Sequence, residues 1–152
     1  MKRYLFKNDK NIYKANLHCH TTVSDGKFTP EEFSIMESHT VNGSEIIESM
    51  RLNEEKDIYL DHCYDICRYH HERWDGNGYP DKISGAEIPL SARIVSIVDV
   101  YDALVSQRVY KPPFSHEEAI NIIKEDAGKK FDPDIVAEFL KSEKIFRKIY
   151  NI

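Results

Sequence analysis

Four residues of types that bind divalent metals are spaced along this chain in a pattern that helices can bring together. His70 and His71 are adjacent at the end of a stretch with helical periodicity, and His39 lies upstream. Asp99 lies downstream in an apolar run, where a buried carboxylate needs a partner because burying it alone costs several kcal/mol. Imidazole nitrogen and carboxylate oxygen are metal ligands. The sequence predicts a metal site here; a hydrogen bond from Asp99 to a neighbouring helix terminus is the alternative.

The segment that follows the paired histidines is rich in turn-forming residues. Gly76 and Gly78 occur in Asp-Gly and Asn-Gly dipeptides, and Pro80 disfavours a helical conformation at Tyr79. Glycine allows a ligand to approach the backbone closely. This segment is therefore a candidate binding loop, with a plain connector between helices as the alternative.

A second group of possible metal ligands lies near the N-terminus. His18 and His20 are two residues apart, so on a strand their side chains would point to the same face, and Asp25 follows them. These residues form either part of a metal site or a surface loop that happens to carry two histidines.

Two of the three cysteines offer another possible site. Cys63, Cys67 and His71 are spaced at four-residue intervals on an expected helix, which makes a zinc site conceivable. Small core side chains are the more common role of such cysteines. An odd number of cysteines without zinc-ribbon spacing indicates free thiols and a reducing compartment.

Composition restricts the classes of partner. With 152 residues and 41% hydrophobic residues, the chain is expected to form one globular domain. A net charge of −5 argues against binding to a DNA or RNA duplex, whereas a small phosphate ligand needs only a few cations. Arg108 and Lys111 are such cations, unless they only complement a helix dipole. No stretch is long and apolar enough for a signal peptide or a membrane span, so we expect a cytoplasmic protein without membrane contact.

The elements that must position these residues are predicted to be helical. Helix-capping residues, helical periodicity and Pro or Gly breaks place helices from Thr29 to about His39, over 44–50 after a break at Asn42-Gly43, over 57–72, over 88–105, from Ser115 and from Asp132. The helix over 88–105 is apolar around most of its circumference and is expected to be largely buried. The sequence thus predicts an all-α domain, preceded by a short irregular or strand-like N-terminal segment.

Residues 26 to about 140 resemble the HD-GYP domain, a bacterial branch of the HD phosphohydrolases. The motifs that carry the resemblance are Glu37-Ser38-His39-Thr40, His70-His71-Glu72, Asp75-Gly76-Asn77-Gly78-Tyr79-Pro80, Ile97-Val98-Asp99-Val100-Tyr101-Asp102-Ala103-Leu104 and Arg108-Val109-Tyr110-Lys111. The resemblance implies an HD-domain-like helical bundle and a metal-dependent phosphodiesterase that hydrolyses cyclic di-GMP.

The same resemblance implies a role for each site residue. His39, His70 and His71 would bind one metal, and Asp99 would bind its neighbour, with iron or manganese as the metals. The loop Gly78-Tyr79-Pro80 would shape the nucleotide site, while Arg108 and Lys111 would hold phosphates. Glu72 and Asp102 would support the metal ligands. Such metals lower the pKa of a bound water and stabilise charge on phosphoryl oxygens.

The N-terminal segment departs from this pattern. The family takes its name from a His-Asp dyad, and the chain has no His-Asp pair upstream of Thr29. Residues 16–32 instead resemble the start of a PHP phosphoesterase, in which the equivalents of His18 and His20 bind metal. We therefore expect a hybrid or truncated chain with an N-terminal segment over 1–28, a truncated HD-GYP-like domain over 29–141 and a C-terminal tail over 142–152.

Three functional hypotheses follow. The first is a phosphodiesterase in which three histidines hold one metal. The second is a catalytically degenerate module that binds a cyclic dinucleotide or a protein partner through the Gly78–Pro80 loop, Arg108 and Lys111. The third is an incomplete fragment that folds only with additional sequence.

Overall fold

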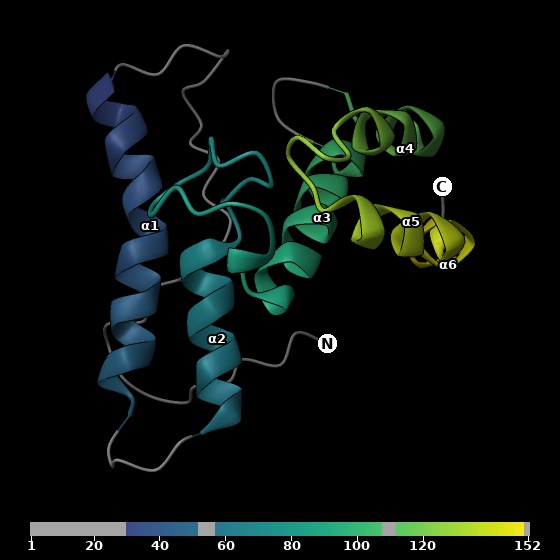
Figure 1. Ribbon diagram of the computed structural model, residues 1–152. Coiled ribbons are helices and arrows are strands. Elements are labelled where there is room, and N and C mark those ends of the chain that lie inside the picture. The colour runs from purple at the N-terminus through teal and green to yellow at the C-terminus, as the bar shows by residue number, and fades with distance from the viewer. Residues whose placement is uncertain (1–29, 52–56, 108–111, 151–152) are drawn as a thin grey trace, which may run out of the picture.

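A computed structural model describes residues 30–51, 57–107 and 112–150, and all regular elements in these ranges are helical (Figure 1). The elements are α1 (Pro30–Ser49), α2 (Ile58–Tyr69), the 3-10 helix η1 (Gly85–Glu87), α3 (Leu90–Val105), α4 (His116–Glu125), α5 (Pro133–Lys141) and α6 (Glu143–Tyr150). The predicted all-α fold is confirmed for the described residues.

Helices α1 and α2 lie side by side, and α3 separates them from α4, α5 and α6 (Figure 1). α1 is continuous, so the break that we predicted at Asn42-Gly43 is wrong. A Cβ atom at Gly43 would lie 3.5 Å from Cβ of Cys67 on α2, in ordinary van der Waals contact. Gly43 thus faces α2 across ordinary packing distance, and we attribute the continuous helix to this packing, which outweighs the low helix propensity of glycine.

From Ser34 to the end of α1, where the structure describes side-chain burial, the buried residues are small and polar. Thr40 and Ser44 are fully buried, and their hydroxyl groups donate hydrogen bonds to the carbonyl oxygens of Glu37 and Val41 on the same helix. Arg68 on α2 also donates to the Ser44 hydroxyl, over 3.4 Å. The described part of this helix pair thus buries hydrogen-bonded side chains rather than a cluster of large apolar ones.

The apolar core belongs to the second part of the chain. Its members come from α3, α4, α5 and the turn before α5: Ile97, Tyr101, Val105, Ala119, Ile120, Ile123, Phe131, Val136 and Phe139. Tyr101 has no exposed surface, and its hydroxyl forms a 2.8 Å hydrogen bond with Nδ1 of His116. The rings of Phe139 and Phe146 pack edge-on against Tyr101. This aromatic cluster fixes α3, which carries Asp99, against α5 and α6.

Helix starts agree with the capping residues in the sequence. The Asp57 carboxylate accepts from the backbone N–H of Tyr59 at the start of α2, and Asp132 does the same for Asp134 at the start of α5. A capping box links Ser115 and Glu118 at the start of α4. α2 ends at Tyr69, three residues before the predicted end at Glu72.

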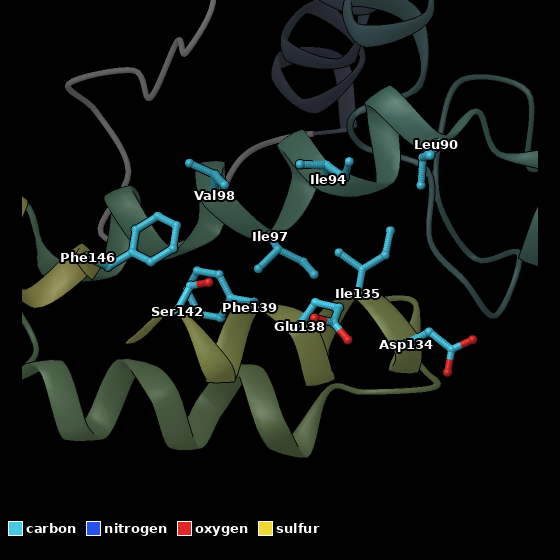
Figure 2. A pocket seen from close by; sticks show the side chains of 10 residues that line it. All are labelled: Leu90, Ile94, Ile97, Val98, Asp134, Ile135, Glu138, Phe139, Ser142 and Phe146. Atoms are coloured by element: carbon cyan, nitrogen blue, oxygen red, sulfur yellow. The ribbon is translucent and has the colours of Figure 1, made fainter. Parts of the chain in front are cut away.

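An apolar pocket of about 430 Å³ lies between α3 and the pair α5 and α6 (Figure 2). Leu90, Ile94 and Val98 line it from α3, and Ile135 and Phe146 face them. Because of this pocket α3 is less buried than we predicted, with Ile94 45% exposed. The pocket contains none of the predicted site residues. Within the described ranges, no helix has both the length and the apolar character that a membrane span requires.

Candidate metal centre

Three histidines from two helices meet at one place in the described structure. His39 lies on α1, His70 caps the C-terminus of α2, and His71 follows it. One ring nitrogen of each histidine lies within 4.8 Å of the other two. The structure thus brings together the three histidines that the sequence analysis assigned to one metal.

The hydrogen bonds of the histidine rings determine which ring nitrogens have a lone pair available for a metal ion. Nδ1 of His39 bonds the carbonyl oxygen of Met36 over 2.5 Å, and Nδ1 of His70 bonds the carbonyl oxygen of Ile66 over 2.7 Å. A carbonyl oxygen only accepts, so each Nδ1 carries the hydrogen and each neutral ring keeps a lone pair on Nε2. The two Nε2 atoms are 3.3 Å apart. Two lone pairs at this distance repel unless they share a cation.

This separation suits a metal ion. Two nitrogens at typical bond lengths from one tetrahedral metal lie about 3.4 Å apart. The carbonyl oxygens that fix the Nδ1 hydrogens also orient the rings, as second partners of metal-bound histidines usually do. The donor set of His39, His70 and His71 therefore fits a divalent transition metal.

Burial favours the neutral form of His70. Loss of solvent lowers the pKa of this ring below its ordinary value, and the neighbouring His39 lowers it further. The hydrogen bond to Ile66 and the charge of Asp99 oppose this shift without reversing it. A neutral imidazole is the form that binds metal, so the site is prepared for a ligand before one arrives.

Two acidic residues act electrostatically on this cluster. Asp99, which is partly buried on α3, lies close enough to influence the pKa of both His70 and Tyr79. Glu37 on α1 also acts on Tyr79, whose pKa is raised by burial first and by these two carboxylates second. Asp99 is one of the residues that the sequence predicts for the site. Glu37 occurs in a motif that carries the resemblance to HD-GYP domains, but we predicted no role for it.

The loop after α2 folds back onto the histidines. The ring of Tyr79 stacks on that of His71 with centroids 4.8 Å apart, and its backbone N–H donates to the carbonyl oxygen of His71. The Tyr79–Pro80 peptide bond is cis. At Gly78 a Cβ atom would lie within 2.7 Å of the backbone of Glu72 and Arg73, closer than any real contact. Only glycine fits there, because backbone packs directly on backbone.

The Glu72 side chain holds this loop in place through hydrogen bonds to its backbone. It is 3% exposed, and its Oε1 accepts from the backbone N–H groups of Asp81 and Lys82 at 2.7 and 2.9 Å. Among the described residues its Oε2 is buried without a hydrogen-bond partner. Burial raises the pKa of this carboxyl, against the lowering effect of the two N–H donors. Glu72 thus supports the binding loop by contacts that the structure shows.

The other predicted residues fall into two groups. His18, His20, Arg108 and Lys111 lie outside the described residues. Asp102 is described, but its carboxylate accepts from the hydroxyl groups of Tyr150 at 2.6 Å and Ser106 at 3.3 Å. These bonds connect Asp102 to α6 and to the end of α3. No hydrogen bond between Asp102 and the histidines is present among the described residues, so its support of the metal ligands stays a prediction.

Cys63 and Cys67, the two cysteines that the structure describes, do not join the metal cluster. Cys63 is exposed, and the group of potential ligands found in the described ranges comprises only the three histidines. Cys67 packs at Gly43, as noted above. Its contact favours the alternative reading of this cysteine as a small packing residue.

Lys130 is a charged residue near the site that the sequence analysis missed. Burial lowers the pKa of its ammonium group, while Asp126 and Asp99 raise it. The backbone around it is tied to the loop, because the N–H of Trp74 donates to the carbonyl oxygen of Lys130. The sequence gives no local signal for this placement, which depends on contacts between segments that are far apart in the chain.

Comparison with known proteins gives a consistent picture. The sequence pattern of the family described as "HD domain" matches residues 18–135. A cyclic di-GMP phosphodiesterase of Vibrio cholerae is 40% identical over 136 residues, which make up 90% of this chain and 28% of that relative. One of Thermotoga maritima is 40% identical over 141 residues, 93% of this chain and 37% of the relative.

A third relative is named for a different substrate. A 3'3'-cGAMP-specific phosphodiesterase of Vibrio cholerae is 38% identical over 116 residues, 76% of this chain and 21% of the relative. The chain therefore spans between 21% and 37% of the length of these three curated relatives.

Proposed function

We propose, from the premise that this chain belongs to the HD domain family, that it is a metal-dependent phosphodiesterase that hydrolyses cyclic di-GMP. The observation that carries the proposal is the pair of Nε2 atoms of His39 and His70, which face each other at 3.3 Å with their lone pairs available. Relatives named as cyclic di-GMP phosphodiesterases, at 40% identity over most of the chain, support the choice of substrate.

His39, His70 and His71 would hold the metal, with Asp99 as a ligand of the same or a neighbouring ion. Iron or manganese is our expectation for the metal, which when bound supplies an activated water and stabilises charge on the phosphoryl oxygens. The carbonyl oxygens of Met36 and Ile66 keep the two rings in the tautomer that leaves Nε2 open. The sequence has no His-Asp pair, so three histidines and one carboxylate fit fewer ions than a site that includes the dyad.

The substrate would lie against the Gly78–Pro80 loop, above the ring of Tyr79. Arg108 and Lys111 are expected to bind its phosphates, as the resemblance to HD-GYP domains implies. A cytoplasmic location suits a nucleotide substrate of this kind and is part of the proposal. The PHP-like origin of residues 16–32 also stays a prediction; the HD domain match begins within that segment, at His18.

A second candidate function is a module that binds a cyclic dinucleotide, or a protein partner, without cleaving anything. The absence of any His-Asp pair from the sequence favours it, because loss of a metal-bridging carboxylate would weaken catalysis more than binding. The binding loop and its Glu72 support do not depend on that dyad.

Metal content and turnover distinguish the two functions. The protein is purified anaerobically without chelators, its metals are measured by mass spectrometry, and cyclic di-GMP and 3'3'-cGAMP are each incubated with it and followed by chromatography. The enzyme hypothesis predicts at least one iron or manganese per chain and cleavage of cyclic di-GMP in preference to 3'3'-cGAMP. Faster cleavage of 3'3'-cGAMP would correct the substrate, and tight binding without cleavage would favour the module.

Variants locate the activity. His70→Ala is expected to lose both metal and turnover, whereas His62→Ala, an exposed histidine on the same helix, should retain them. Arg108→Ala should weaken nucleotide binding while the circular-dichroism spectrum stays helical. Retention of full metal content and turnover in His70→Ala would rule out the histidine cluster as the centre.

A further inference from the structure

Lys130 is a partly buried lysine in the turn before α5, and the charge of Asp99, the carboxylate assigned to the candidate metal centre, acts on its ammonium group. The carbonyl oxygen of Asp126 accepts from the backbone N–H groups of residues 129, 130 and 131, which winds the turn tightly. The N–H groups of Trp74 and Asp75 donate to the carbonyl oxygens of Lys130 and Lys129 at 3.1 and 2.8 Å. The turn is thereby tied to the segment directly after the paired histidines.

The ammonium group of Lys130 has charged neighbours but forms no ion pair with any residue that the structure describes. Asp126, Asp99 and Arg73 are the charged groups that act on it from the turn itself, from α3 and from the loop. Arg73 is already engaged, because its guanidinium makes two hydrogen bonds to the Asp75 carboxylate at 3.0 and 2.7 Å. Within the described part of the chain, no carboxylate forms a salt bridge with Lys130, and its Nζ lies 5.5 Å from the centroid of the Phe131 ring.

A partly buried ammonium without a salt bridge is costly, since solvent that would stabilise it is partly excluded. In the protein alone, Asp99 and Asp126 offset some of this cost. When a divalent cation occupies the histidines and Asp99, the negative charge of Asp99 is neutralised and the surroundings of Lys130 become more positive. An anion bound beside the metal would then offset the excess positive charge around Lys130.

We propose that Lys130 binds a non-bridging phosphate oxygen of the substrate, beside Asp99 and the metal centre. The proposal rests on the proposed function for the identity of the substrate, and it adds a phosphate-binding residue on a turn distant in sequence from the loop and the cations already considered. A lysine suits this task, because its ammonium is a compact point charge that reaches one phosphate oxygen without a planar geometry.

The alternative is structural: the aliphatic part of the Lys130 side chain packs on Phe131 and the ammonium only extends toward solvent. Lys129 provides a matched control, since it is the preceding residue of the same turn, has the same charge and is exposed. Both lysines use their backbone carbonyl oxygens to hold the turn, and substitution of either side chain leaves those bonds in place.

The test measures binding by calorimetry for the full chain and for Lys130→Ala, Lys130→Arg and Lys129→Ala. Two probes are used on manganese-loaded protein: cyclic di-GMP and inorganic phosphate. Lys130→Ala is expected to weaken both by roughly 10- to 100-fold, the effect of losing one hydrogen bond to a charged group. Lys130→Arg should recover part of the affinity, Lys129→Ala should match the unmodified protein within about twofold, and metal content should be equal in all four.

The outcomes separate this proposal from the proposed function. If cyclic di-GMP is bound or cleaved and Lys130→Ala binds both probes normally, the function stands and the role of Lys130 is wrong. If cyclic di-GMP is neither bound nor cleaved but phosphate binding still depends on Lys130, the role of Lys130 stands and the substrate is wrong. Equal losses of affinity in Lys129→Ala and Lys130→Ala would show a general charge effect and overturn the proposal.

Discussion

The two parts of the described chain bury different kinds of residue. Every large apolar side chain of the core cluster lies after residue 96, in α3, α4, α5 and the turn before α5. In α1 and at the end of α2, the buried residues are Thr40, Ser44 and His70. Hydrophobic burial therefore stabilises the second part directly, whereas the first part depends on close helix packing and hydrogen bonds.

The difference in buried residues explains why the candidate metal centre lies in the first part of the chain. At His39 and His70, carbonyl oxygens of the polar helix pair bind each Nδ1 and leave each Nε2 open, which the apolar cluster of the second part could not do. The apolar second part contributes Asp99 and Lys130 from its edge. The bond from Trp74 to the carbonyl oxygen of Lys130 and the 2.5 Å ion pair of Arg93 with Asp132 tie the segments around the site together.

The largest expected effect tests the apolar part. Phe139→Ala removes a ring that is 7% exposed and contacts Tyr101 and Phe146, so we expect a loss of about 3–5 kcal/mol in the free energy of unfolding. Denaturant titration measures it. Ile149→Ala, at a side chain that is 66% exposed, serves as the control and should change stability by less than about 0.5 kcal/mol. Similar small losses in both variants would mean that this cluster does not dominate stability.

The next effect tests the polar part. At free manganese about a thousandfold above its dissociation constant, bound metal should add about 4 kcal/mol of stability, and His39→Ala should abolish this increment. Without metal the same variant should lose less than about 1 kcal/mol, because it also removes the repulsion between the two Nε2 lone pairs. Thermal unfolding with and without manganese measures both values. A normal metal increment in His39→Ala would separate metal binding from the histidine cluster.

A smaller effect tests the connection between the two parts. Glu72→Ala removes an acceptor of two backbone N–H groups, so we expect a loss of about 2 kcal/mol and faster hydrogen exchange at the amides of Asp81 and Lys82. Glu72→Gln keeps the Oε1 acceptor and should recover much of the loss. If exchange at these two amides is unchanged in Glu72→Ala, the carboxylate does not hold the loop.

The smallest effect concerns pH. Burial lowers the pKa of His70 in the folded protein, so the unfolded chain binds the proton more readily. Stability of the metal-free protein should therefore fall as the pH drops below the ordinary histidine range, and should be retained above it. Denaturant titrations at pH 7.5 and 5.5 measure the difference, which should shrink in His70→Gln. An identical difference in that variant would assign the pH dependence to other groups.

Local signals predicted much of the fold. The caps at Asp57, Ser115 and Asp132 set helix starts through hydrogen bonds within a few residues, and such bonds are visible in sequence. The expected break at Asn42-Gly43 was wrong because the contact of Gly43 with Cys67 comes from another helix. Exposure of Ile94 likewise depends on how far α5 lies from α3, which periodicity does not reveal.

The same distinction applies to the site. Residue type and helical context indicated a metal site at His39, His70 and His71, the resemblance to HD-GYP domains assigned them to one ion, and the structure brings their ring nitrogens together. The partial burial of Lys130 and the effect of the Glu37 charge on Tyr79 both depend on tertiary packing. The expected support of the metal ligands by Asp102 came from the resemblance to HD-GYP domains, whereas the hydrogen bonds that the structure describes for this carboxylate go to Tyr150 and Ser106.

The backbone contact at Gly78 has a consequence for how the loop can vary. Asn77 is exposed, so a library of substitutions at this position should give many folded, soluble variants that differ in what the loop presents to a ligand. At Gly78, one residue later, even a methyl group meets the main chain of Glu72 and Arg73. Two adjacent positions thus differ in mutational tolerance. To change ligand preference in this loop, the first can be varied to any residue that keeps its backbone N–H bond to the Asp75 carboxylate, which excludes proline, whereas the second must stay glycine.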